Sequence, residues 1–179
     1  ITTANPYTVT MTGAANTVTA DVDFLNGGLV TLGDGGGDTF SFIGGLAFTG
    51  NAASSLNSAI STTGNTANFG TGGVTLAGDS SVDTTNGGGV AAGANMTFGG
   101  LVTDAAGGFD LALDGGTGGA IAFNNAGALT FADLTITNAA SVNITGSVTL
   151  NDLITTAATA TTVTMTGAAN TVTADVDFL

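Results

Sequence analysis

Residues 8–25 read TVTMTGAANTVTADVDFL, and residues 162–179 repeat those letters without a difference. Subtracting 8 from 162 gives a repeat offset of 154 residues. A register kept between such copies is typical of arrays in which each unit stacks on the next. We therefore interpret residues 1–179 as a single segment of a tandem repeat. Its unit is about 154 residues long, and residues 162–179 begin the next unit.

A weaker repeat lies inside the unit. Residues 30–32 and 74–76 both read VTL, and each triplet is followed by two aspartates at similar spacing, an offset of 44 to 45 residues. Two coils of about 22 residues would span this offset, and about seven would span the whole unit. The inner repeat therefore predicts a regular winding of the chain.

Short alternating runs of polar and apolar residues dominate the chain, separated by glycine-rich clusters such as residues 35–37 and 86–89. Alternation with period two predicts strands, and the glycines predict tight turns. The strand spacing also fits a sandwich or a barrel, but the repeat favours a structure that continues from unit to unit. We predict an all-β parallel β-helix, or β-solenoid, with about seven coils per 154-residue repeat.

One segment is a weak candidate for a helix. In residues 52–60, Leu56 and Ile60 would share one helical face. A loop that protrudes from the solenoid is the alternative interpretation.

The charged side chains are all of one sign. The chain has 13 acidic residues, no Lys, Arg or His, and a net charge of −13. Nucleic-acid binding requires cations that neutralise phosphates, and anionic membrane surfaces require them too, so we expect neither partner. No apolar run approaches the roughly 18 residues of a membrane helix, so we expect no membrane insertion. The 43% hydrophobic content indicates an ordered chain.

Calcium is the one cofactor that this composition favours, and none is required. Thirteen carboxylates without a protein counter-charge need cations from solution, and Ca²⁺ takes carboxylate and backbone oxygens in loops. Two aspartates separated by one residue share a strand face, and two others flank a glycine run. The alternative is solvated turn aspartates that accept hydrogen bonds from nearby backbone N–H groups. The candidate calcium ligands are Asp21, Asp23, Asp34, Asp38, Asp175 and Asp177.

Catalytic chemistry has few candidates. Without His, Lys or Cys, nothing can activate a Ser or Thr nucleophile in the common ways. Paired carboxylates, such as Asp21 with Asp23 or Asp110 with Asp114, are the one arrangement left for sugar hydrolysis. The first pair is copied with the repeat, and a copied feature indicates structure. We therefore predict that the chain is not an enzyme.

Residues 107–157 read GGFDLALDGGTGGAIAFNNAGALTFADLTITNAASVNITGSVTLNDLITTA. The cadence of LAL, IAF, LTIT and VTL between Gly, Asn and Asp turns resembles the β-strand repeats of very large bacterial surface proteins. These are the filamentous-haemagglutinin-like and autotransporter-like adhesins, and the resemblance extends over essentially the whole chain. It implies a right-handed parallel β-helix that is secreted and displayed at the cell surface.

Three functions follow as hypotheses. The first is an extracellular structural fibre or surface filament whose partners are copies of itself, joined end to end or laterally. The alternative is the stalk of a large adhesin that binds surfaces through another region. A minor alternative is an ice-binding solenoid, suggested by Thr-x-Thr pairs, although residues 111–113 and 121–123 interrupt that pattern.

Overall fold

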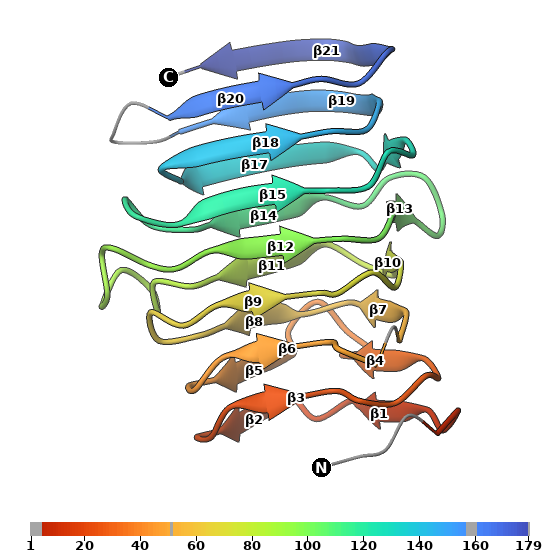
Figure 1. Ribbon diagram of the computed structural model, residues 1–179, viewed down its shortest axis with the longest axis vertical. Coiled ribbons are helices and arrows are strands. Elements are labelled where there is room, and N and C mark those ends of the chain that lie inside the picture. Colours follow the sequence, from red (N-terminus) through yellow and green to blue (C-terminus); the bar gives the residue numbers. More distant parts are fainter. Residues whose placement is uncertain (1–4, 51, 157–160, 179) are drawn as a thin grey trace.

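The computed structural model describes residues 5–50, 52–156 and 161–178, and every helix or strand assigned in these ranges is a β-strand. The strands of successive coils pair in parallel, which confirms the predicted all-β parallel β-helix. Figure 1 shows the coils stacked from the N-terminus to the C-terminus, rising in a right-handed sense. The described part of the chain contains no helical segment that could serve as a membrane span.

Each coil has three positions for a strand, and strands at one position of successive coils form one face. The first face contains β1 (Val9–Met11), β4 (Val30–Leu32), β7 (Ser54–Leu56), β10 (Val74–Leu76), β13 (Val102–Asp104) and β16 (Leu129–Thr130). The second contains β2 (Ala15–Val18), β5 (Thr39–Phe42), β8 (Ala59–Ser61), β11 (Ser80–Asp83), β14 (Leu111–Asp114) and β17 (Asp133–Asn138). The third contains β3 (Val22–Asp23), β6 (Leu46–Ala47), β9 (Ala67–Asn68), β12 (Met96–Phe98), β15 (Ala120–Phe123), β18 (Ser141–Ile144) and β20 (Thr162–Met165). Two long strands, β19 (Val148–Thr155) and β21 (Asn170–Phe178), pass from the first face to the second.

The register between coils gives the length of each coil. One outward position of the first face is occupied in turn by Thr10, Thr31, Ser55, Thr75, Thr103, Thr130, Thr149 and Thr171. The 161 residues from Thr10 to Thr171 make seven coils, or 23 residues per coil, close to the predicted 22. Residues 30–32 and 74–76 lie two coils apart, so the inner repeat is confirmed.

The two copies of the repeated segment lie on different faces. Residues 9–11 form β1 on the first face, whereas residues 162–165 form β20 on the third. The 154-residue offset therefore spans six coils and two further faces, in line with the predicted seven coils. In both copies the same side chains pack against the core, Val9 and Met11 in the first and Val163 and Met165 in the second. The alternating sequence thus fits more than one face.

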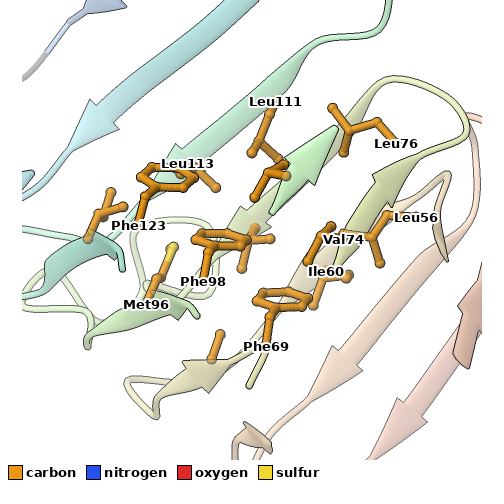
Figure 2. Close-up of a cluster of buried hydrophobic side chains, with 14 of the residues drawn as sticks. Leu56, Ile60, Phe69, Val74, Leu76, Met96, Phe98, Leu111, Leu113 and Phe123 are labelled. Atoms are coloured by element: carbon orange, nitrogen blue, oxygen red, sulfur yellow. The ribbon is translucent and has the colours of Figure 1, made fainter. Parts of the chain in front are cut away.

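The core is built from the inward residues of all three faces. Five phenylalanines stack along the axis with neighbouring ring centroids 4.8 to 5.5 Å apart: Phe24, Phe48, Phe69, Phe98 and Phe123. Figure 2 shows three of these rings in a column beside leucine and valine side chains from other strands. Removing such side chains from water supplies most of the stability of a packed core.

The helix considered for residues 52–60 does not form, so that prediction was wrong. These residues contribute β7 and β8, which lie on two different faces. Leu56 and Ile60 are both buried, but a corner of the coil separates them. At this corner the Ser58 hydroxyl donates to the Leu32 carbonyl oxygen at 3.0 Å. Two strand ends joined by a corner thus reproduce the spacing of one helical turn.

The corners depend on glycine where the chain passes close to the coil below. Gly70 follows the buried Phe69 and has a φ of 61°, in the left-handed region. A Cβ at this position would overlap the carbonyl oxygen of Phe48 in the adjacent coil. Only glycine meets both requirements here without strain.

Replacing Phe98 by alanine tests the phenylalanine stack. Phe98 is fully buried between Phe69 and Phe123, with ring centroids 4.8 Å away on each side. We expect Phe98→Ala to lower the free energy of unfolding by about 3 to 5 kcal/mol, measured by chemical denaturation. Leu29→Ala is the control, because Leu29 is 42% exposed and should change the stability by only about 0.5 kcal/mol. Equal effects of the two substitutions would contradict the packing described.

Candidate functional site

The first predicted metal-binding pair lies at the third face. Asp21 and Asp23 are both exposed, and Asp23 belongs to β3. The Asp23 carboxylate accepts hydrogen bonds from the hydroxyl of Thr49 at 2.7 Å and from its backbone N–H at 3.3 Å. Asp23 therefore already joins two adjacent coils.

The second predicted pair closes a turn. The Asp38 carboxylate, which is buried, accepts the backbone N–H of Asp34 at 2.9 Å. The backbone N–H of Asp38 donates in turn to the carbonyl oxygen of Gly35 at 3.0 Å. Asp38 thus behaves as the turn-capping aspartate of the alternative interpretation.

The third predicted pair repeats the sequence of the first but has other surroundings. Asp175 and Asp177 lie on the part of β21 that pairs with the second face. Asp175 donates its backbone N–H to Asp152 at 2.8 Å. Because the two copies occupy different faces, a pair copied in sequence does not become a pair copied in space.

The structure does not bring the candidate ligands together. Asp21 and Asp23, Asp34 and Asp38, and Asp175 and Asp177 lie in three separate places along the described chain. Within that part of the chain no group of three or more acidic side chains is arranged to hold a metal ion. Calcium binding at these six residues stays a prediction.

Asp104 shapes a loop, a role that the sequence did not predict. The Asp104 carboxylate accepts backbone N–H groups from Ala106, Gly107, Gly108 and Phe109. Burial raises the pKa of Asp104, but these four hydrogen bonds outweigh it and lower the pKa from 3.8 to about 2. The signal in the sequence was an aspartate directly before small residues and two glycines.

Five aspartates stack at one corner of successive coils, just before or at the start of the segments that form the second face. The sequence did not predict this arrangement, although it offered Asp110 and Asp175 for other roles. We name the five residues the aspartate column: Asp79, Asp110, Asp133, Asp152 and Asp175. At each step the backbone N–H of the upper aspartate donates to the Oδ1 of the lower one, at 3.1, 3.2, 3.1 and 2.8 Å from bottom to top. Burial raises the pKa of Asp110, and the neighbouring carboxylates of Asp133 and Asp79 raise it further.

A second uninterrupted column lies on the first face. It consists of the eight outward Thr and Ser residues from Thr10 to Thr171, which we name the hydroxyl column. Each of these side chains is exposed or half-buried. Residues 111–113 and 121–123, which interrupt the Thr pattern in the sequence, lie on the second and third faces. The column of hydroxyl groups is therefore continuous in space although it is not regular in sequence.

The Asp104 loop supplies a test. Asp104→Asn removes the charge that four backbone N–H groups share, so we expect the free energy of unfolding to fall by about 1 kcal/mol at pH 7 after allowance for solvent screening. Because the folded pKa is lowered, this contribution is present above pH 3.8 and is lost as the pH falls through about 2. Thermal unfolding of both proteins between pH 2 and pH 7 measures it. A stability difference that stays constant over this range would contradict the assignment.

Comparison of the chain with protein-family models, with curated proteins and with solved structures gives no match. The resemblance to bacterial surface adhesins therefore rests on the cadence of strands and turns.

Proposed function

We propose that this chain is a rod-like, non-catalytic segment of an extracellular structural fibre or surface filament, built from copies of itself. The observation that carries the proposal is the position of the two sequence copies. Residues 9–23 form the lowest described coil, and residues 162–178 form the uppermost strands of the same parallel stack. A segment that recurs within one parallel stack is typical of arrays in which each unit stacks on the next.

The chemistry of the end coils supports this proposal. The outer edge of a parallel stack presents backbone N–H and C=O groups that another strand can pair with. Val176 and Phe178 of β21 are 42% and 61% exposed, whereas their partners Leu153 and Thr155 one coil below are buried. A further coil would remove these apolar side chains from water.

An adhesin stalk is the alternative, with the same local structure and with the binding region elsewhere. The two functions differ in how one repeat unit is connected to the next. A filament assembles from separate chains, whereas a stalk is a single long polypeptide. Denaturing electrophoresis of the native fibre separates them, because we expect separate chains of similar length from a filament and one very long polypeptide from a stalk.

Extending the chain tests the continuous stack. Appending one more copy of residues 26–179 adds 154 residues, or between six and seven coils. At a strand spacing of about 4.8 Å we expect the particle to lengthen by roughly 32 Å with an unchanged cross-section. Small-angle X-ray scattering measures both dimensions. Two compact bodies joined by a flexible connection would contradict the proposal.

Ice binding is a second candidate, and the hydroxyl column is the observation that favours it. The eight outward positions from Thr10 to Thr171 carry hydroxyl groups at the regular spacing of paired strands, and none carries a charge. The 13 aspartates of the chain occupy other positions. A neutral, regular row of hydroxyl and methyl groups matches an ordered lattice of water better than it matches a charged ligand.

A bulky substitution in the hydroxyl column tests this candidate. If the column binds ice, Thr75→Tyr should abolish most of the freezing-point depression that nanolitre osmometry measures for the parent protein. Thr97→Tyr is the matched control, because Thr97 is an outward residue between two buried neighbours, as Thr75 is, but lies on the third face. Ice growth that the parent protein does not change would remove the candidate.

A further inference from the structure

The aspartate column places carboxylates of like charge directly above one another. Asp79, Asp110 and Asp133 occupy equivalent corners of three successive coils. The backbone N–H groups of Asp110 and Asp133 donate to the carboxylate Oδ1 of the aspartate below at 3.1 and 3.2 Å. Paired strands lie about 4.8 Å apart, so neighbouring carboxylates in this column are held at roughly that spacing. Like charges at such short range repel each other.

No positive side chain relieves this repulsion. The chain has no Lys, Arg or His, so the other side chains that ionise near the column are aspartates too. Asp152 continues the column above, and Asp104 holds the loop that leads to Asp110. Below, Gly36 of the turn between Asp34 and Asp38 lines a hollow beside Asp79 and Asp110. All the ionisable side chains that these elements bring near the column are therefore acidic.

We propose that Asp79, Asp110 and Asp133 of the aspartate column make the solenoid sensitive to pH, with weaker contact between coils in neutral solution and stronger contact in mildly acidic solution. Protonation removes the repulsion but leaves an oxygen that still accepts the backbone N–H of the next coil. A protonated carboxyl also gains an O–H that can donate to the carboxylate above or below it. The column then joins the coils by hydrogen bonds without like-charge repulsion between them.

The direction of the pH dependence follows from the pKa of Asp110. Because burial and the carboxylates of Asp133 and Asp79 raise this pKa above 3.8, the stabilising contribution is complete below 3.8 and is lost as the pH rises through the raised value. Asp104 acts in the opposite direction, since its contribution is lost as the pH falls from 3.8 to about 2. The stability should therefore be greatest in mildly acidic solution.

The test removes two charges from the column while keeping the hydrogen-bond acceptors. In Asp110→Asn/Asp133→Asn each amide oxygen can still accept the backbone N–H above it. We expect this variant to melt about 2 to 4 °C higher than the parent at pH 7, and the difference to disappear once the pH falls below 3.8. All samples contain EDTA, so that divalent ions do not screen the carboxylates.

The matched control is Asp21→Asn/Asp23→Asn, which removes the same net charge from two exposed residues outside the column. It should retain the rise in melting temperature that the parent shows on acidification. The proposal is overturned if both variants behave alike, or if the parent loses stability as the pH falls from 7 to 3.8.

A measurement on the unaltered protein covers the case in which a variant does not fold. Carbon-13 NMR of the aspartate carboxyl groups follows the titration of Asp110 directly. We expect the Asp110 carboxyl to titrate above 3.8. Titration at or below that value would contradict the proposal without any substitution.

Discussion

The structure depends on the parallel pairing of each coil with the next. This pairing satisfies the backbone hydrogen bonds along the axis and fixes the separation of neighbouring coils at about 4.8 Å. A side chain therefore contacts its counterpart in the next coil more closely than it contacts most of its neighbours in sequence. The effect of a side chain on stability therefore depends on how well it packs against the same type of side chain in the next coil.

Three columns show the range of outcomes. The phenylalanine rings gain from stacking, with centroids 4.8 to 5.5 Å apart. The hydroxyl column is neutral and β-branched at most positions, which suits an outward strand surface. The aspartate column combines a favourable hydrogen bond with an unfavourable repulsion. The same spacing between coils thus produces a stabilising core, a neutral surface and a corner whose contribution to stability depends on pH.

The same pairing explains how the coils absorb differences in length. Coils range from 19 to 28 residues, but the strands of the first face keep their register because most additional residues lie in corner loops. The longest of these coils carries the loop at residues 84–95, and the next carries the loop held by Asp104. A corner loop lies outside the stack, so its length changes neither the core nor the spacing of the coils.

Much of the fold was accessible from the amino-acid sequence. The alternation of polar and apolar residues determined which side chains point inward, because successive residues of a strand face opposite sides. The turn glycines and the two repeats determined that these strands wind into stacked coils. The offset between residues 30–32 and 74–76 even gave two coils correctly, because a long coil and a short coil average to the predicted length.

Only the tertiary structure decided which side chains meet. Asp38 and Asp83 follow the inner repeat at similar spacing, but Asp83 lies two coils above Ser41 instead. The pair Asp21 and Asp23 and its copy, Asp175 and Asp177, lie on different faces for the same reason. Coil lengths vary in the corners, so a constant offset in the sequence does not correspond to a constant position on the solenoid. Alternation depends only on neighbouring residues in the chain. Which residues share a column depends instead on the lengths of all the corners that precede them.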